Sequence, residues 1–394
     1  MTTVDDAHDA GLLQSVGKLG PAIAAAADEI ERLRDIPDAL FDRLIEHDLF
    51  RLLLPRAYGG AEIDPLLYVR MLEEVAKSDA STAWCLGQNN VCAMVAAYLE
   101  PAAAREIFDS PRAILAWGPG PGEARVTDGG YLLSGKFDFA SGSRHATWLG
   151  AHVPVIEPDG SRRTATDGSA RLHTLLFPRS QAQVHDNWRV LGLRGTGSDS
   201  YSVTGVRVPE SRTLVRDNAV ALRQKGPLYV FTQSHLYASG FASIALGIGQ
   251  ACFDAFVGGI RDTVPRGASR SRGANNVVQS EVAQAEARLR SSRMFLRGSL
   301  QEIWAGVVRS GAMTDEQRLT IRLASTWAIQ QSREAVTALY LAAGALAIFE
   351  SQPFERRLRD IHTLCQQMQG HAAHFETVGQ MRMGMKLERP LFTF

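Results

Sequence analysis

The triplet Ser141–Gly142–Ser143 places two hydroxyl groups on either side of a residue without a side chain. Such a turn offers hydroxyls and backbone N–H groups at one spot, because Gly142 adds no Cβ bulk. His145 follows in the same polar turn, and its imidazole can either contact a substrate or bond to a backbone carbonyl. The turn is therefore a candidate hydrogen-bonding site for a ligand, with both roles of His145 open.

Other residues that could take part in chemistry do not form a complete site. His371 and His374 have the spacing of a metal pair on a helix, but no matching carboxylate or cysteine lies close in sequence, so we expect no metal. The glycines from Gly118 to Gly122 alternate with prolines and precede no P-loop lysine, which excludes a nucleotide phosphate loop. The four cysteines form no C-x-x-C pair, so a reducing cytoplasm is the expected location.

Composition narrows the class of protein. The 394 residues include 42 basic and 42 acidic side chains, so the formal net charge is zero and nucleic acid is not an expected partner. The first eleven residues contain three aspartates where an export signal would be basic. The apolar stretch 237–260 is interrupted by Gln250 and Asp254, which favours a buried helix over a membrane span. We expect a soluble enzyme of two or three domains.

Proline positions divide the chain into parts. Nine of the 16 prolines lie from Pro101 to Pro227 and none lies between Pro265 and Pro353, which predicts long helices in that second stretch. Apolar residues there recur on one helical face: Val282, Ala285, Leu289, Leu296, Leu300, Ile303 and Val307. Helices are also predicted over 12–34, 37–47, 65–78, 81–99, 234–262 and 315–347, and strands over 131–139, 172–177 and 201–208. This order predicts an N-terminal helical domain (1–112), a middle β domain (113–220) and a C-terminal helical bundle (221–394).

Several segments, each weak alone, together resemble the acyl-CoA dehydrogenase fold family, and more closely its two-component flavin-dependent (group D) monooxygenase branch. These segments are Leu54–Gly60, Ser81–Trp84, Phe139–Trp148, Gly192–Ser198, Val208–Glu210 and Glu355–Thr363. The resemblance covers nearly the whole chain. It implies a mainly α protein with a central β-barrel, a C-terminal four-helix bundle, a homotetramer, and a flavin between barrel and bundle.

The two main activities of that family require different residues. A dehydrogenase removes a proton beside a thioester while hydride leaves for the flavin, so it needs a carboxylate base. The resemblance places that base eight residues after the Arg359–Asp360 pair, where this chain has Met368, or on an earlier helix, where it has Tyr237. Neither is a carboxylate, which favours the monooxygenase branch. Asp360 itself is expected to pair structurally with an arginine.

A monooxygenase must shield a flavin–oxygen adduct from water and hold it by hydrogen bonds. The resemblance implies that Ser141, with Gly142 and Ser143, contacts the polar edge of the flavin. The acid–base position of this branch, seven residues after the Arg-Asp pair, is Gln367 here, and His371 lies four residues further on. His371 could give or take a proton one turn away if that segment is helical. The candidate catalytic residues are therefore Ser141, His145, Gln367 and His371.

The resemblance also assigns residues around the cofactor and the substrate. Arg194, Thr196 and Ser198 are expected in a turn beside the flavin, with a purely structural turn as the alternative. Arg270 and Gln279 resemble the segment that reaches a neighbouring subunit's flavin diphosphate, with a solvated loop as the alternative. The side chains expected to line an aromatic substrate pocket, or else to pack in the core, are Trp84, Trp117 and Tyr237.

The combined prediction is the oxygenase component of a two-component flavin-dependent monooxygenase. It would use FADH2 or FMNH2 from a separate NAD(P)H:flavin reductase, with O2, to hydroxylate a small aromatic or heteroaromatic substrate. One alternative is an acyl-CoA dehydrogenase with an unrecognised base. The other is a non-catalytic paralogue that keeps the fold for assembly alone.

Overall fold

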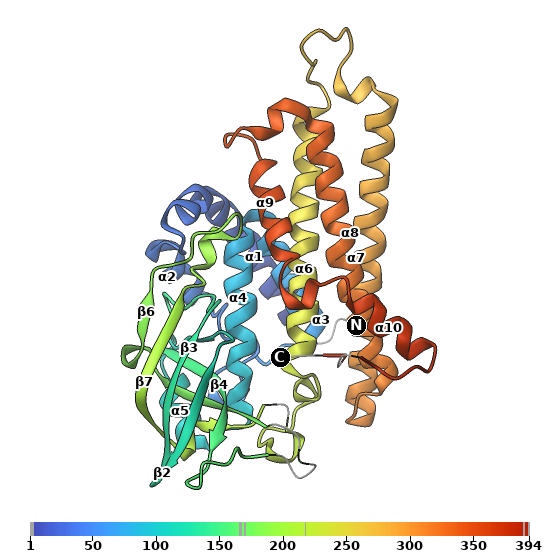
Figure 1. The fold of residues 1–394 in the computed structure, drawn as a ribbon. Coiled ribbons are helices and arrows are strands. Elements are labelled where there is room, and N and C mark those ends of the chain that lie inside the picture. Colours follow the sequence, from blue (N-terminus) through green and yellow to red (C-terminus); the bar gives the residue numbers. More distant parts are fainter. Residues whose placement is uncertain (1–3, 165–167, 169–170, 217, 389–390, 393–394) are drawn as a thin grey trace.

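The computed structural model describes residues 4–164, 168, 171–216, 218–388 and 391–392 of the chain. Helices come first, then a β-sheet, then longer helices, which agrees with the predicted order (Figure 1). Residues 112 and 220 both fall in connections between these parts, and the exact division into three domains stays a prediction. One continuous apolar core runs through all three parts, and a smaller cluster lies under the first strand.

The N-terminal helices are α1 (Val4–Leu33), α2 (Asp38–Glu46), α3 (Pro65–Ser78), α4 (Ala80–Ala93) and α5 (Pro101–Phe108). Aspartates start two of them. Asp64 accepts hydrogen bonds from the N–H groups of Leu66 and Leu67, and Asp79 accepts one from Thr82. Because Asp79 ends α3 and starts α4, the chain turns sharply there, and the nearly all-buried α4 lies between the sheet and the long helices (Figure 1).

The sheet has eight strands: β1 (Leu115–Trp117), β2 (Gly122–Thr127), β3 (Gly130–Phe137), β4 (Trp148–Ile156), β5 (Leu172–Pro178), β6 (Gln183–His185), β7 (Ser200–Pro209) and β8 (Thr213–Leu214). Their order is β6-β7-β3-β2-β4-β5-β8, with β1 parallel to β4. The expectation of a barrel is wrong in one respect, because no ladder joins β6 to β8 in the described strands and the sheet is open. Closure needs a continuous ladder, and end strands of three and two residues offer too few pairs.

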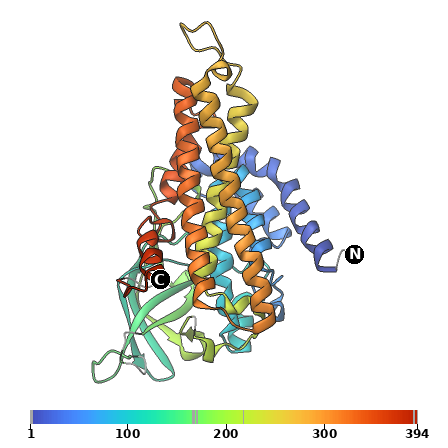
Figure 2. The ribbon, with the colours of Figure 1, turned by 90° about the vertical axis from the view of Figure 1, so that its right-hand side faces the viewer.

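The C-terminal helices are α6 (Gln233–Ala255), α7 (Asn276–Ser310), α8 (Asp315–Ala343), α9 (Glu355–Leu364) and α10 (His374–Arg382). Helices α6, α7 and α8 are long and run side by side, while α9 is short, so the expected four-helix bundle is not confirmed in the described part of the chain (Figures 1 and 2). On α7, all the periodic apolar residues except Val282 are buried. The apolar stretch that begins in α6 is a buried helix as predicted, with 72% of its most apolar window inside the protein.

Candidate active site

A chain of three side-chain hydroxyls joins α4 to the sheet domain. The indole Nε1 of Trp84 donates to Ser141 Oγ at 2.9 Å, and Ser141 Oγ lies 2.7 Å from Ser198 Oγ. Ser198 Oγ lies 2.7 Å from Thr196 Oγ1, whose hydroxyl donates to the carbonyl of Leu193 at 2.9 Å. We call Ser141, Ser198 and Thr196 the hydroxyl chain. The structure therefore brings four sequence-predicted residues to one place: Trp84, Ser141, Thr196 and Ser198.

Gly142 is required by its contact with α4. Its φ is +74°, and a Cβ there would lie 2.4 Å from Asn89 Oδ1. The Asn89 amide in turn donates to the carbonyls of Leu115 and Ser141 at 3.0 and 3.3 Å, and the Gly142 N–H donates to the Thr196 carbonyl at 2.9 Å. The turn is thus clamped between α4 and the 194–198 segment, which holds Ser141 in position.

Phe139 lies two residues before Ser141, in the Phe139–Trp148 segment, and is a candidate that the sequence alone did not single out. Its φ of +60° is rare for a bulky residue, and such strain costs about 1–3 kcal/mol. The ring is nevertheless 63% exposed and meets the Trp188 ring edge-on at 6.1 Å. An exposed aromatic ring held by a strained backbone, two residues before Ser141 in the sequence, could stack on a flat ring ligand. An aromatic residue beside the Ser-Gly-Ser turn is the sequence signal that could have revealed it.

The predicted pocket residues separate into two groups. Trp84 stacks on Phe241 with ring centroids 3.9 Å apart, and Phe241 stacks on Tyr237 at 5.6 Å. The Tyr237 hydroxyl accepts from Gln88 Nε2 at 3.2 Å, and burial raises the pKa of Tyr237 well above its ordinary value. Tyr237 is therefore neutral and unsuited to act as a base, which makes this group an apolar wall behind Ser141.

Trp117 lies on β1 and is not part of that stack. Its ring meets His152 edge-on at 4.8 Å, and the Arg216 guanidinium lies over it at 5.5 Å. Burial and the Arg216 charge hold the pKa of His152 well below its ordinary value, so this imidazole is neutral. The charge of Arg216 also acts on Tyr237, which indicates that the Trp117 group borders the first.

The predicted acid–base segment is not helical where the sequence required it. Helix α9 ends at Leu364, and Gln367 has an extended backbone that starts a 3-10 turn at Met368–Gly370. The Gln367 side chain accepts from the Gln369 N–H at 2.6 Å, and the exposed His371 accepts from the Ala373 N–H at 3.1 Å. The condition under which His371 would lie one helical turn from Gln367, a helical segment, is therefore not met. The catalytic role of either residue stays a prediction.

A buried acid on α9 holds the turn that begins the hydroxyl chain. Asp360 Oδ1 accepts from the Leu193 N–H at 2.6 Å, so its partner is a backbone group and not the expected arginine. Leu193 has a φ of +52°, and its carbonyl accepts from both Trp188 Nε1 and Thr196 Oγ1. Burial raises the pKa of Asp360 to about 7. Arg194 bonds to the Val190 carbonyl at 3.0 Å and lies 3.5 Å from Glu31, which favours the structural alternative for it.

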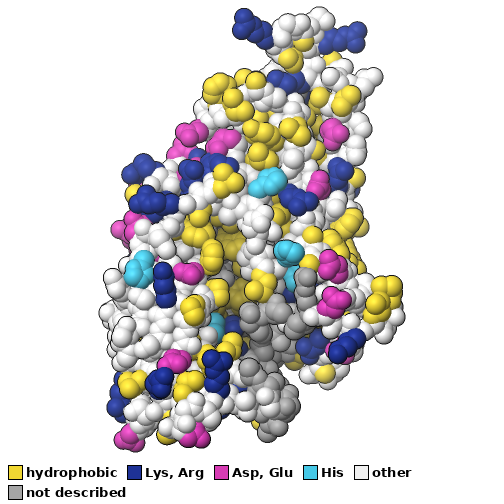
Figure 3. Space-filling view, viewed as in Figure 1, with side chains coloured by type: hydrophobic (Ala, Val, Ile, Leu, Met, Phe, Trp, Pro, Cys, Tyr) yellow, Lys and Arg dark blue, Asp and Glu magenta, His cyan; other side chains and the backbone are white. Residues whose placement is uncertain are grey.

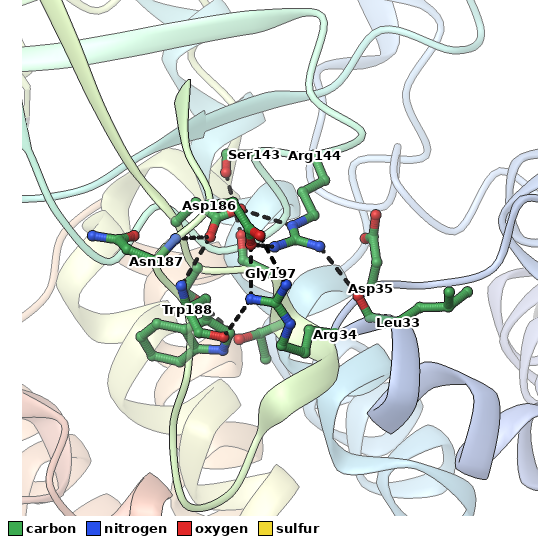
Figure 4. Close-up of polar contacts among 12 residues, drawn as sticks. Leu33, Arg34, Asp35, Ser143, Arg144, Asp186, Asn187, Trp188 and Gly197 are labelled. Carbon is green, nitrogen blue, oxygen red and sulfur yellow. Dashed lines mark hydrogen bonds and ion pairs between the residues drawn. The ribbon is translucent and has the colours of Figure 1, made fainter. Parts of the chain in front are cut away.

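Behind the turn lies a charged network that Figure 4 shows from close by. Arg34 and Arg144 converge on Asp186, with N–O distances of 2.7 and 2.8 Å, and Arg144 also bonds to the buried Asp199 at 2.7 Å (Figure 4). The Ser143 hydroxyl donates to the Gly197 carbonyl at 3.3 Å. Ser143 is therefore a bracing residue of the turn, whereas Ser141 belongs to the hydroxyl chain.

His145 faces the connection between α1 and α2. Its Nε2 lies 2.9 Å from the Ile36 carbonyl and 3.0 Å from Asp35, and its ring stacks on Phe41 at 4.1 Å. Of the two roles left open, this geometry favours the bond to a backbone carbonyl.

Arg270 and Gln279 are remote from Ser141 within one chain. Both are exposed near the α6–α7 connection, which projects from the far end of the long helices (Figures 1 and 2). Gln279 Nε2 donates to the Gly273 carbonyl at 2.9 Å. A single chain therefore does not unite these two residues with the hydroxyl chain.

Hydrophobic side chains gather in a hollow between the sheet and the long helices, as Figure 3 shows. Within the described ranges, no group of three or more His, Cys, Asp or Glu side chains could hold a metal ion. A flavin needs an apolar face and hydrogen-bonding groups at its polar edge. The exposed ring of Phe139 and the hydroxyl of Ser141, two residues apart in the sequence, are groups of these two kinds.

Family models match both helical parts of the chain. The acyl-CoA dehydrogenase N-terminal domain matches residues 19–107, and the C-terminal domain of the same family matches residues 239–374. The chain belongs to the acyl-CoA dehydrogenase fold family. This confirms the resemblance seen in the sequence, and the sheet that carries the Ser-Gly-Ser turn lies between the two matched domains.

Curated relatives of this acyl-CoA dehydrogenase-fold chain are oxygenases. It is 27% identical over 375 residues to the indole-3-acetate monooxygenase of Pseudomonas putida, covering 93% of this chain and 94% of that protein. It is also 27% identical to the flavin-dependent monooxygenase oxygenase subunit HsaA of Rhodococcus jostii, covering 89% and 92%.

Solved structures agree. XiaF from Streptomyces sp., in complex with FADH2 and glycerol, superposes with a TM-score of 0.89 at 25% identity over 97% of both chains. The HsaA monooxygenase of Mycobacterium tuberculosis superposes with a TM-score of 0.86 at 25% identity over 97% and 99%. Sequence and structure therefore agree on the family, and these relatives and structural neighbours include flavin-dependent monooxygenases.

Proposed function

We propose that this chain is the oxygenase component of a two-component flavin-dependent monooxygenase that hydroxylates a small aromatic or heteroaromatic compound. One observation carries the proposal. The polar groups joined at the site are three hydroxyls and an indole N–H, with no carboxylate among them. The acids next to it are engaged elsewhere, Asp199 by Arg144 and Asp360 by the Leu193 N–H.

In this proposal the residues of the site have separate roles. A bound reduced flavin supplies the electrons for the reaction with O2. Phe139 gives its rings a face to stack on, and Ser141 provides a hydrogen-bonding oxygen that Trp84 and Ser198 hold in place. The Trp84–Phe241–Tyr237 stack excludes water behind Ser141, as reactive oxygen chemistry requires.

The finer assignments are proposals as well. Structural neighbours hold different flavins, FADH2 in XiaF and FMN in TdsC, so we propose that either FADH2 or FMNH2 serves here. A separate reductase would supply it, in keeping with relatives named as oxygenase components. In a homotetramer, Arg270 and Gln279 would reach a neighbouring subunit's flavin. The four buried, free cysteines support a cytoplasmic location.

The test mixes the purified protein with a flavin reductase, NADH, either flavin and a panel of phenols and indoles under 18O2. A product carrying one 18O atom, formed only when the protein is present, is the expected result. Flavin turnover without any oxygenated product across the panel would contradict the proposal. Anaerobic bleaching of bound oxidised flavin by an acyl-CoA would instead indicate a dehydrogenase.

A further inference from the structure

We infer that Thr196 and Ser198 orient the Ser141 hydroxyl so that Ser141 accepts a hydrogen bond at the flavin site, and that this selects reduced over oxidised flavin. The inference rests on the proposed function, because it assumes that a flavin's N5 edge meets Ser141. It adds a role for two residues that do not themselves need to touch the cofactor.

The direction of the hydroxyl chain follows from its two ends. At one end, the Thr196 hydroxyl gives its single hydrogen to the Leu193 carbonyl at 2.9 Å. Thr196 must then accept from Ser198 across 2.7 Å, which leaves Ser198 without a hydrogen for Ser141. Ser141 therefore donates to Ser198 across their 2.7 Å contact.

At the other end, Trp84 fixes the remaining capacity of Ser141. The indole N–H can only donate, and it occupies one of the two lone pairs of Ser141 Oγ at 2.9 Å. Ser141 has then given away its hydrogen and keeps one lone pair. Toward a ligand it presents an acceptor.

If the hydrogen bonds of the hydroxyl chain run in the opposite direction, the protein makes one hydrogen bond fewer. If Ser141 is to donate outward, Ser198 must donate to Ser141 and Thr196 to Ser198, and the bond from Thr196 to the Leu193 carbonyl is lost. That carbonyl still accepts from Trp188 Nε1 at 3.1 Å and from the Thr196 backbone N–H at 3.2 Å, so the turn survives, but the buried Thr196 hydroxyl no longer donates to it. One such hydrogen bond changes an equilibrium about fivefold.

Flavin chemistry makes this direction matter. Reduced flavin carries a hydrogen on N5 and can donate it to the lone pair of Ser141, whereas oxidised flavin has only a lone pair on N5 and needs a donor. The forward direction therefore fits the reduced cofactor without rearrangement. Oxidised flavin requires the reversed chain, and we expect it to bind about fivefold more weakly on this account.

The test measures dissociation constants for oxidised and for reduced FMN and FAD, the latter anaerobically, by fluorescence and absorbance titration. In Thr196→Val the hydrogen bond from the Thr196 hydroxyl to the Leu193 carbonyl is gone. Ser198 can then donate its hydrogen to Ser141, so the direction of that hydrogen bond can reverse. The ratio of oxidised to reduced dissociation constants should therefore fall about fivefold, chiefly through tighter binding of oxidised flavin. The same fivefold change corresponds to about 20 mV in the two-electron potential of the bound flavin.

Thr196→Ser is the matched control, because it keeps the hydroxyl and should keep the wild-type ratio. Ser198→Ala is the second variant, since it frees the Ser141 hydrogen without touching Thr196, and it should lower the ratio as well. An unchanged ratio in both Thr196→Val and Ser198→Ala overturns the inference while leaving the proposed function intact. Wild-type protein that binds neither flavin overturns both.

Discussion

Replacing Asp360 by asparagine should remove a pH dependence of folding stability that originates at one buried group. Burial raises the pKa of Asp360 from 3.8 to about 7. The folded protein therefore holds this proton more tightly than the unfolded chain does. The stability that the protonated acid contributes is complete below about pH 4 and is lost as the pH rises to about 7.

The size of the effect follows from the shift. Three pKa units correspond to about 4 kcal/mol, an upper value for the free energy of unfolding that the wild type loses between about pH 4 and pH 7 through this group. An asparagine does not titrate, and its side-chain oxygen can still accept from the Leu193 N–H. The free energy of unfolding of Asp360→Asn, relative to wild type, should thus rise across that range.

The assay is urea unfolding of wild type and Asp360→Asn at half-unit steps from pH 4 to pH 8. Taking the difference between the two proteins cancels the titration of groups that do not interact with Asp360; Asp79 and Glu31, which do, add a smaller change to it. Asp128→Asn, in an exposed turn, is the control and should follow the wild type throughout. Parallel stability curves for wild type and Asp360→Asn would refute the assignment of a neutral acid at this position.

Three other substitutions test the turn at Gly142, the exposed ring of Phe139, and an ion pair between α3 and α7. Gly142→Ala should destabilise the fold by more than Gly160→Ala. Both glycines have a positive φ, but only at Gly142 would the new Cβ contact Asn89, at 2.4 Å. The free energies of unfolding of the two variants, from thermal unfolding, should differ by about 1–3 kcal/mol. Phe139→Ala should leave stability within about 1 kcal/mol of wild type, since the ring is exposed, but weaken flavin binding about tenfold through the lost stacking face, and an unchanged flavin dissociation constant would refute that role. Glu73→Gln should cost about 2 kcal/mol in urea unfolding, because this buried carboxylate bonds two partly buried arginines of α7 at 2.6 Å each, and a neutral outcome would show that water replaces it.

Much of the fold could be predicted because its signals are local. The absence of proline and the spacing of apolar residues such as Leu289 and Leu296 predicted α7, and short alternating runs predicted β3, β5 and β7. The open sheet could not be predicted, because closure depends on whether the ends of a sheet find each other in space. A strand of two residues, such as β8 at Thr213–Leu214, leaves almost no pattern to detect.

The end of α9 before the predicted acid–base residues could not be predicted for a related reason. Residues 365–369 contain three glutamines and a methionine, which favour helix, so the sequence offered no local reason for α9 to end at Leu364. The structure supplies a tertiary one. The Gly370 carbonyl accepts from Gln330 Nε2 at 2.6 Å, and a Cβ on Gly370 would lie 3.2 Å from Ile329. Contacts with α8 thus hold an extended turn that helix propensity opposes.

The site shows the same division between what is local and what is not. Ser141 and Thr196 could be predicted as site candidates because each lies in a recognisable segment. The direction of the hydrogen bonds between them depends on Leu193, and the position of Leu193 depends on Asp360. The chain of contacts from α9 to Ser141 therefore passes through backbone groups that carry no sequence signature. The bond from the Leu193 N–H to Asp360 also explains why α9 has an acid next to Arg359 that does not serve as a base. The carboxyl group of Asp360 holds the Leu193 turn. Asp360 therefore acts on the proposed flavin site only indirectly, by positioning Leu193, which in turn binds Thr196.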